Sequence, residues 1–425
     1  MKKKFKVCVV GLGYVGMPLA VEFSKKYQVF GYDKSKKKIE NLNLGIDDTQ
    51  QYKKKEINNI FFSNDPINIS ESEFIIVCIP TPVDKANNPD LKSLKLASQT
   101  IGKNLTNNSV IIYESTVYPG ATEDVCLKIL KKNTKLKYIK DYNIGYSPER
   151  VNPGDKKNTL KNIAKIISGN NKKTLKKIDI LYKNIVNKVY PVSSIRVAEA
   201  SKVIENTQRD VNIGLINEFS LILNELNLNV KEVLDAARSK WNFLKFEPGL
   251  VGGHCIGVDP YYLAYVSKKT KIKPKVILSS RDVNEGMTKM LFNRVTKNVD
   301  KKKKILIFGL TFKENCPDLR NSKNLELVKK LISSKYNVTI NDEFVNKEEL
   351  SKNNILKYSM DFKNLKMKKF DLVLLLVKHN YLIKSKISVF LNLLKKSGII
   401  YDFKNIFSET EKKIFKQKKL NYLDF

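Results

Sequence analysis

Hydrophobic positions divide the chain into two ends with short apolar runs and a middle with a helical period. Near the N-terminus, apolar runs predict strands separated by helical segments, at residues 6–10, 28–33, 74–79, 110–113 and 142–146. The alternation returns near the C-terminus, where strands are predicted at 304–309, 337–341, 371–377 and 398–403. Such alternation is typical of a doubly wound, largely parallel sheet.

In the middle, apolar residues recur every three or four positions from about Ser194 to Leu226, with Gly214 as the only glycine. This spacing predicts one long helix, and a second helical zone surrounds 230–238. We therefore predict an α/β fold with two Rossmann-like doubly wound domains joined by a helical central domain. The predicted domains are 1–193, 194–298 and 299–425.

The formal net charge of +35 raises the possibility of nucleic-acid binding. The lysines, however, run along the whole chain of 425 residues, so we predict a lysine-coated surface without specific nucleic-acid binding. Arginine is rare, at positions Arg150, Arg196, Arg209, Arg238, Arg281, Arg294 and Arg320. In so lysine-rich a chain, an arginine indicates a position where the planar fork of donors is required and lysine does not suffice.

The five cysteines, Cys8, Cys78, Cys126, Cys255 and Cys316, show no CxxC pair and no metal-ligand spacing. They predict reduced thiols in a cytoplasmic protein without a metal site. No stretch of about twenty apolar residues occurs, which predicts that no segment spans a membrane.

A dinucleotide fingerprint follows the first predicted strand. Gly11 permits a tight turn, Gly13 lets the backbone approach a pyrophosphate, and Gly16 lets helix and strand pack closely. Asp33 closes the second strand, where a carboxylate accepts hydrogen bonds from the adenosine ribose and disfavours the extra phosphate of NADP. The pattern predicts NAD as cofactor.

Two further loops follow strands at the carboxyl edge of the predicted sheet, where α/β folds bind ligands. They carry Thr81 and Thr116, whose hydroxyls suit the nicotinamide half or the substrate. Each is otherwise an ordinary loop threonine. The segment 147–153 is a third such loop, or a proline-punctuated turn.

The stretch 243–260 contains a Gly-rich loop with Cys255 and, four residues later, Asp259. Such a loop wraps a ligand with main-chain N–H groups, and a thiol there is placed for covalent attack on a carbonyl. The alternative is a cysteine that packs as a small hydrophobe. On the long helix, Lys202, Asn206 and Arg209 share one face and suit an oxyanion and phosphates, or form a solvated face.

Taken together, the chain resembles the UDP-glucose/GDP-mannose dehydrogenase family along nearly its whole length. The matching motifs include Gly-Leu-Gly-Tyr-Val-Gly16, Pro80-Thr-Pro82, Glu114-Ser-Thr116, Ser-Pro-Glu-Arg150, Gly-Gly-His-Cys255, Phe312-Lys313 and Asp318-Leu-Arg320. The stretches around Cys255 and Arg150 are similar to the branch that acts on UDP-N-acetylhexosamines, which implies UDP-GlcNAc or UDP-GalNAc as substrate.

The resemblance implies a four-electron oxidation of the sugar C6 alcohol to a carboxylate with two NAD, for surface polysaccharide precursors. It implies that Cys255 is the nucleophile, Lys202 the acid/base, Asn206 an oxyanion donor, and Asp259, with Thr116 and Glu149, the group that positions water.

Further implied contacts with NAD involve Tyr14, Val15, Asp33, Thr81, Thr116 and Arg320, and Lys38 stands where relatives often carry an arginine near the ribose. Implied contacts with the UDP-sugar involve Arg150, Val151, Lys202, Asn206, Arg209, Gly252, Phe312 and Lys313. Arg238, or else Lys240, matches an arginine that reaches a neighbouring subunit's UDP. In the family the middle helices form a dimer, and the C-terminal domain binds UDP.

Two alternatives stay open at this point. One is another nucleotide-sugar dehydrogenase, acting on UDP-glucose, UDP-ManNAc or GDP-mannose. The other is a basic module for nucleic acid or anionic polysaccharide with a decayed enzyme core. That second reading predicts a lost nucleophile or a broken glycine motif, yet Cys255, Lys202 and Asp259 are all present.

Overall fold

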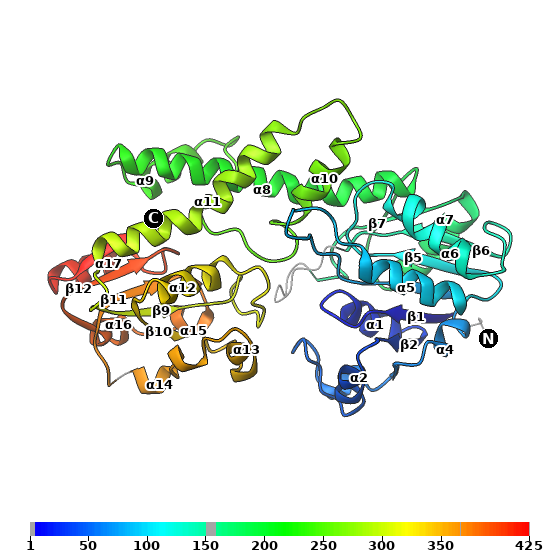
Figure 1. The fold of residues 1–425 in the computed structure, drawn as a ribbon, viewed down its shortest axis with the longest axis horizontal. Coiled ribbons are helices and arrows are strands. Elements are labelled where there is room, and N and C mark those ends of the chain that lie inside the picture. The colour runs from blue at the N-terminus through cyan, green and yellow to red at the C-terminus, as the bar shows by residue number, and fades with distance from the viewer. Residues whose placement is uncertain (1–4, 150–158, 366, 425) are drawn as a thin grey trace. The chain divides into compact units, whose positions relative to one another are not determined.

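The computed structural model describes residues 5–149, 159–365 and 367–424. The chain forms two compact units, one from residues 1–206 and 261–273 and the other from residues 207–260 and 274–425. Each unit is built around one sheet with helices around it (Figure 1).

The first unit contains an eight-stranded sheet of order β3-β2-β1-β4-β5-β6-β7-β8. Its strands are β1 (Lys6–Val10), β2 (Gln28–Tyr32), β3 (Ile60–Ser63), β4 (Phe74–Val77), β5 (Ser109–Tyr113), β6 (Tyr142–Tyr146), β7 (Lys165–Gly169) and β8 (Val189–Pro191). Strands β6 and β7 pair antiparallel, and the other neighbours pair parallel. The strand order reverses between β1 and β4, which creates the switch point where open α/β sheets bind ligands.

The helices of this unit connect and cover the strands. They are α1 (Gly16–Ser24), α2 (Lys36–Asn43), α3 (Lys54–Ile57), α4 (Ile67–Ser70), α5 (Lys92–Lys103), a π-helical turn (Thr122–Cys126), α6 (Leu127–Asn133) and α7 (Lys172–Lys183). Consecutive residues of β1, which point to opposite faces, are all buried from Val7 to Val10. Both faces of the sheet are therefore covered, as a parallel sheet requires.

The second unit contains a five-stranded parallel sheet of order β10-β9-β11-β12-β13. Its strands are β9 (Lys304–Phe308), β10 (Asn337–Asn341), β11 (Phe370–Leu375), β12 (Leu394–Asp402) and β13 (Asn421–Asp424). Its helices are α9 (Val230–Arg238), α11 (Lys275–Asn298), α12 (Lys323–Ser333), α13 (Lys347–Lys352), a 3-10 turn (Leu356–Tyr358), α14 (Phe362–Leu365), α15 (Asn380–Ile383), α16 (Ile387–Leu393) and α17 (Glu409–Gln417).

Alternate residues of β9 enter different layers of the core. Ile305 and Ile307 pack in a cluster with side chains of α11 and α12, whereas Leu306 and Phe308 pack with those of α16 and α17. Two further helices, α8 (Ile195–Glu225) and α10 (Asp259–Ser267), contribute residues to both units.

The predicted fold class is confirmed: two parallel-sheet, Rossmann-like parts and a helical middle are present. The helix predicted at about 194–226 is α8, and the strands predicted at 142–146 and 337–341 are β6 and β10 with those bounds. Strands β3, β7, β8 and β13 were missed because each has at most three consecutive apolar residues and no regular alternation of apolar and polar positions. The two predicted domain boundaries stay a prediction.

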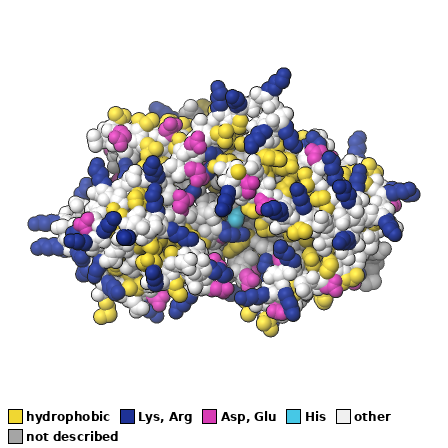
Figure 2. Space-filling model, in the orientation of Figure 1, with side chains coloured by type: hydrophobic (Ala, Val, Ile, Leu, Met, Phe, Trp, Pro, Cys, Tyr) yellow, Lys and Arg dark blue, Asp and Glu magenta, His cyan; other side chains and the backbone are white. Residues whose placement is uncertain are grey.

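The lysine excess is not gathered in one place on the face that Figure 2 shows. Figure 2 shows Lys and Arg side chains scattered over the visible face, with Asp and Glu among them. In the part of the chain that the structure describes, no helix is long and apolar enough to cross a membrane.

Candidate functional site

The first glycine turn lies between β1 and α1. Gly11 has a φ of +94° and donates its N–H to the Tyr32 carbonyl at 2.8 Å. A Cβ on Gly11 would lie 2.7 Å from the Cys78 carbonyl oxygen, and a Cβ on Gly16 only 1.8 Å from the Gly11 oxygen, so both positions need glycine. Around Gly13, in contrast, no described atom lies within 4 Å of a Cβ position. The turn is thus tight at its ends and open at the place where a pyrophosphate is expected.

Helix α1 leaves its amino end available to a ligand. Tyr14 and Val15 form the turn into the helix, and the N-cap Val15 has no side chain that accepts a hydrogen bond. The first turn contains no acidic residue. The leading N–H groups and the positive end of the helix dipole therefore suit an anion.

Asp33 lies at the end of β2, directly beside this turn. Its carboxylate accepts from the Leu12 N–H and from the Ser35 N–H, both at 3.0 Å, and forms an ion pair with Lys38 at 3.0 Å. Burial alone would raise the pKa of Asp33, but Lys38 and the two N–H donors outweigh it and lower that pKa. Asp33 is therefore an ionised acceptor fixed to the glycine turn, and Lys38 accompanies it.

The structure brings the predicted loops after β4 and β5 together. The Ile79 N–H donates to Ser115 Oγ at 2.9 Å, and Thr81 Oγ1 donates to the Thr116 carbonyl at 2.5 Å. Tyr262 donates its hydroxyl proton to the Thr81 carbonyl. Thr81 and Thr116 thus lie at one edge of the sheet. The Thr81 hydroxyl and the Thr116 carbonyl are already hydrogen-bonded to each other.

Beneath these loops lies a buried ion pair that sequence reasoning did not find. Lys165 at the start of β7 contacts Glu114 at 2.5 Å, and Tyr182 donates to the same carboxylate. Lys165 also donates to the Pro148 carbonyl at 3.1 Å. Glu114, which belongs to a matching motif, therefore supports the 147–149 loop from below.

Helix α8 presents the predicted acid/base residue on a buried face. Lys202 donates from Nζ to the Glu149 carbonyl at 2.5 Å, and both residues are buried. Asn206, one turn further, is fully buried, whereas Arg209 is exposed. Arg150 and Val151, which follow Glu149, lie outside the described residues.

Glu199 lies one turn before Lys202 and is a second residue that the sequence did not single out. It accepts from the N–H groups of Gly120 at 2.5 Å and Thr122 at 2.9 Å, and it is fully buried. Burial raises the pKa of Glu199 to about 7, and these N–H donors offset only part of that effect.

In the second unit, Cys255 is exposed and heads a helical turn. Its carbonyl accepts from the Val258 N–H at 3.2 Å and the Asp259 N–H at 2.9 Å, and Asp259 is buried. The other four cysteines are buried. Because the amino end of a helical turn favours negative charge, this position suits a thiolate.

The predicted substrate residues Gly252 and Phe312 meet at the cysteine loop. A Cβ on Gly252 would lie 2.8 Å from the Asn321 carbonyl oxygen and 3.1 Å from Phe312 Cβ. Gly253 has a φ of +83°, and a Cβ there would lie 2.7 Å from the Phe312 ring. The double glycine is thus required by close packing against the loop that follows β9.

His254 is held neutral beside the thiol. Burial and the positive charge of Arg320 lower the pKa of His254 to about 4, against the opposing effect of Asp318. Arg320 itself forms an ion pair with Asp318 at 2.6 Å. A neutral imidazole does not supply the positive charge that a thiolate needs, so that charge has to come from another cation.

The Lys313 loop is anchored by a buried histidine. His379 accepts at Nδ1 from the Asn315 N–H at 3.0 Å, and its Nε2 lies 3.3 Å from Asp342 and from Thr311 Oγ1. Thr311 in turn donates to the Lys313 carbonyl at 2.8 Å. These hydrogen bonds therefore fix the shape of this predicted substrate loop.

Two further cationic side chains, Arg238 and Lys404, have different surroundings. Arg238 contacts its own chain, through Asp235 at 3.2 Å and Glu247 at 2.9 Å, while Lys240 is exposed. Lys404 was not predicted as a site residue. It follows β12 at the carboxyl edge of the sheet, 3.1 Å from a Cβ position on Gly249, and burial lowers its pKa. Its place directly after a strand is the signal that could have identified it.

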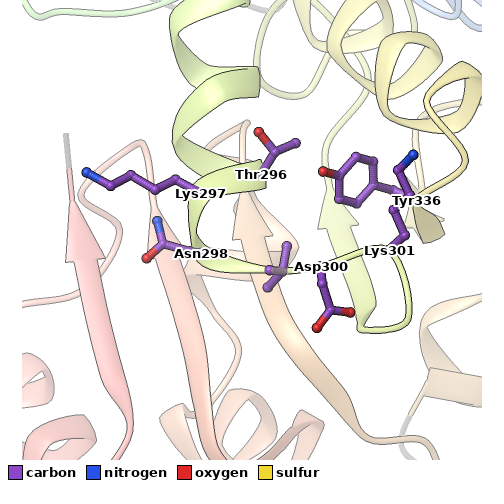
Figure 3. A pocket seen from close by; sticks show the side chains of 7 residues that line it. Thr296, Lys297, Asn298, Asp300, Lys301 and Tyr336 are labelled. Atoms are coloured by element: carbon purple, nitrogen blue, oxygen red, sulfur yellow. The ribbon is translucent and has the colours of Figure 1, made fainter.

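Two hollows of the second unit differ in their position relative to these loops. One cavity of about 420 Å³ contains Arg320 in its wall. Another, also about 420 Å³, lies where α11 turns into β9 (Figure 3) and is lined by Thr296, Lys297, Asn298, Val299, Asp300, Lys301 and Tyr336. The latter precedes the amino ends of β9 and β10, opposite to the edge where α/β sheets bind ligands, so it is not the candidate site.

Comparison with known proteins agrees with the arrangement of these loops. Three domain models of the UDP-glucose/GDP-mannose dehydrogenase family match: the NAD binding domain at 5–186, the central domain at 196–286 and the UDP binding domain at 306–409. Protein CapL of Staphylococcus aureus is 44% identical over 414 residues, which are 95% of this chain and 97% of CapL.

The UDP-N-acetyl-D-glucosamine 6-dehydrogenase of Salmonella typhi is 46% identical over 355 residues, 81% of this chain and 84% of that protein. Among solved structures, a UDP-D-ManNAc dehydrogenase from Pyrococcus horikoshii has a TM-score of 0.83 at 28% identity, over 95% of this chain and 96% of that one.

The three matching domains, on a chain with a glycine turn beside a fixed carboxylate and a thiol on a glycine loop, make this protein a nucleotide-sugar dehydrogenase. The chain belongs to the UDP-glucose/GDP-mannose dehydrogenase family and uses NAD.

The Glu199 contacts predict a pH dependence of stability. The folded-state pKa of about 7 exceeds the ordinary value of 4.5, so the folded protein holds this proton more tightly than the unfolded chain. The free energy of unfolding therefore falls as pH rises from about 4.5 to 7, by up to about 1.4 kcal/mol per pH unit. Urea titrations at pH 5 and pH 8 should show a smaller fall for Glu199→Gln than for wild type.

The matched control is Glu205→Gln on the exposed side of the same helix. It should keep the wild-type pH dependence. An equal fall for Glu199→Gln and wild type would show that Glu199 is ionised throughout.

Proposed function

We propose that this protein oxidises the C6 alcohol of a UDP-N-acetylhexosamine, UDP-GlcNAc or UDP-GalNAc, to the uronic acid with two NAD. The observation that carries the proposal is the exposed Cys255 thiol at the head of a helical turn, on a loop shaped by Gly252 and Gly253. A dehydrogenase that stopped at the aldehyde would need no such nucleophile.

The residues take the following roles in this proposal. Lys202 removes the proton of the C6 alcohol, and NAD, when bound, accepts one hydride in each of the two oxidations. The Cys255 thiolate then forms a C–S bond to the aldehyde carbon, and the oxygen takes a proton. In the second oxidation this thiohemiacetal loses a hydride from carbon while Lys202 takes the hydroxyl proton, and a thioester remains. Water attacks the thioester, the C–S bond breaks, and thiolate and acid are released.

The negative charge on the C6 oxygen of the sugar increases and then decreases in each of these steps. The Lys202 ammonium and the Asn206 amide are the proposed donors to that oxygen, since preorganised donors in a buried setting stabilise developing charge strongly. Asp259, with Thr116 and Glu149, is proposed to position the hydrolytic water. Because His254 is neutral, we assign stabilisation of the thiolate to Lys202 and the helical turn.

The remaining proposed contacts follow the same division of the chain. We propose that residues 1–193 bind NAD through Gly11, Gly13, Gly16 and Asp33. Further proposed NAD contacts are Tyr14, Val15, Lys38, Thr81 and Thr116 in this segment and Arg320 in the C-terminal one. We propose that 194–298 provide Cys255 and the dimer, and that 299–425 bind UDP through Phe312 and Lys313. Arg150, Val151, Arg209, Gly252 and Arg238 complete the proposed substrate contacts.

The choice of an N-acetylglucosamine or N-acetylgalactosamine substrate is supported by the 46% identity to a UDP-N-acetyl-D-glucosamine 6-dehydrogenase. A UDP-ManNAc dehydrogenase is the second candidate, supported by a fold match at 28% identity. Comparing kcat/KM for UDP-GlcNAc and UDP-ManNAc separates the two. The acidic product, a UDP-uronic acid, is a donor for a cytoplasmic pathway to surface polysaccharide.

Cys255→Ala separates the two halves of the chemistry. Without sulfur, neither thiohemiacetal nor thioester forms, so steady-state acid formation should be lost, while the first oxidation can still give slow or single-turnover NADH. Cys255→Ser should accumulate an ester, because an alkoxide leaves less readily than a thiolate. Lys202→Ala should slow both oxidations by about 100-fold or more. Acid is measured by chromatography and NADH by absorbance.

Cys8→Ala is the matched control, since that thiol is buried within strand β1 and belongs to none of the proposed site loops. It should keep wild-type acid formation. If Cys255→Ala also formed acid at the wild-type rate, the covalent mechanism would be wrong.

We also propose that the protein is at least a homodimer. Leu215, Phe219 and Ile222 follow one another at i, i+4 and i+7 on α8, Leu226 comes directly after the helix, and each is exposed. Val233 on α9 adds to the apolar surface of this region. Contiguous exposed apolar side chains are typical of a protein interface.

Ile222→Asp should weaken this interface, because a carboxylate would be buried without a partner. Sedimentation velocity should show a shift toward monomer for Ile222→Asp. Lys289→Asp, which places the same side chain at an exposed position of α11, should sediment as wild type does. A wild-type protein that sediments as a monomer at micromolar concentration would contradict the proposal.

A further inference from the structure

A buried polar cluster joins α8 to α11 in the second unit. Asp210 and Asn217 of α8 and Asn284 of α11 are fully buried, and Arg281 of α11 is 1% exposed. Removing a guanidinium and a carboxylate from water is costly even when they pair. Apolar side chains could fill the same space without this desolvation cost. The buried polar cluster therefore indicates a specific role.

The members of the cluster form a continuous chain of hydrogen bonds. Arg281 Nη1 donates to Asp210 Oδ1 at 2.6 Å, and its Nη2 pairs with Glu285. Asn284 Nδ2 donates to the same Asp210 oxygen at 2.8 Å. Asn217 Nδ2 then donates to Asn284 Oδ1 at 2.8 Å. The fork of Arg281 thus connects two carboxylates, and Asp210 orients Asn284.

The chain of hydrogen bonds holds the start of the cysteine loop. Asn217 accepts from the Gly249 N–H at 2.8 Å and donates to the Gly249 carbonyl at 3.0 Å. With Asn284, Asn217 therefore makes three hydrogen bonds that together fix its amide plane. Gly249 lies six residues before Cys255.

The same cluster also supports the end of the loop. The Arg281 guanidinium lies directly behind Gly257, two residues after Cys255. A Cβ built on Gly257 would lie 3.9 Å from Nη1 and 4.0 Å from Nη2 of Arg281, which is ordinary contact distance. Both ends of the loop that carries the thiol therefore rest on one buried network.

We propose that Arg281, through Asp210, Asn284 and Asn217, is a positioning residue that sets the direction of the Cys255 thiolate toward the aldehyde carbon. This inference rests on the proposed role of Cys255 as nucleophile. Lysine does not replace arginine here, because one ammonium does not span two carboxylates in a plane. This accounts for an arginine at position 281 in a chain that otherwise uses lysine.

Arg281→Lys tests the proposal because it keeps the charge and removes the fork. We expect acid formation to fall about 10- to 100-fold, since a misplacement of about 1 Å has effects of that size. The NADH formed in a single turnover of the first oxidation, and the KM for the UDP-sugar, should change less than threefold, about the error of such comparisons. The rate of Cys255 alkylation by iodoacetamide, measured by peptide mass spectrometry, should differ from the wild-type rate.

Arg294→Lys is the matched control on the same helix. Arg294 donates to the Tyr401 hydroxyl at 3.2 Å and lies in none of these contacts, so this variant should behave as wild type. If Arg281→Lys does not fold, Asn217→Ala tests the same claim, because it removes both bonds to Gly249 and leaves the ion pair intact.

The results separate this inference from the proposed function. Acid formation by Arg281→Lys at the wild-type rate, or equal losses in both oxidations and in thermal stability, would overturn the positioning role. Acid formation by Cys255→Ala would instead overturn the covalent function itself, whatever Arg281→Lys does.

Discussion

The buried polar face of α8 is the constraint on which the loops of both units depend. A helix normally buries apolar side chains, yet this one buries Glu199, Lys202, Asn206, Asp210 and Asn217 at helical spacing. A buried polar group left without a partner costs about 1–3 kcal/mol. The loops after β5 and β6 supply N–H and carbonyl groups to the first part of the helix, and the cysteine loop and α11 supply them to the second.

Both sheets contain the same glycine turn, but the carboxylate beside the turn has different surroundings in each. Gly11 and Gly309 both have a φ of +94°, and the residue after each donates its N–H to a carboxylate at the end of the next strand, Asp33 in one case and Asp342 in the other. In the first unit that carboxylate keeps a partly exposed edge beside Lys38. In the second it is enclosed by His379. The same backbone turn therefore leaves its carboxylate partly accessible in the first sheet and enclosed in the second.

Much of this arrangement could be predicted from the sequence where the signal is local. The period of apolar residues located α8, and the glycine spacing with Asp33 located the turn that the structure shows to be tight at Gly11 and open at Gly13. The Glu114–Lys165 and Arg281–Asp210 ion pairs could not be predicted from local patterns in the sequence. Their members lie 51 and 71 residues apart, and only the fold brings them together.

The central claim is that one enzyme carries a C6 alcohol through two oxidations on a single sulfur. Its most direct test is the number of NADH formed per uronic acid, with UDP-GlcNAc, UDP-GalNAc, UDP-ManNAc, UDP-glucose and GDP-mannose supplied separately. The account predicts two NADH per acid, with UDP-GlcNAc or UDP-GalNAc as the best substrate. One NADH per product, with an aldehyde released, would contradict it.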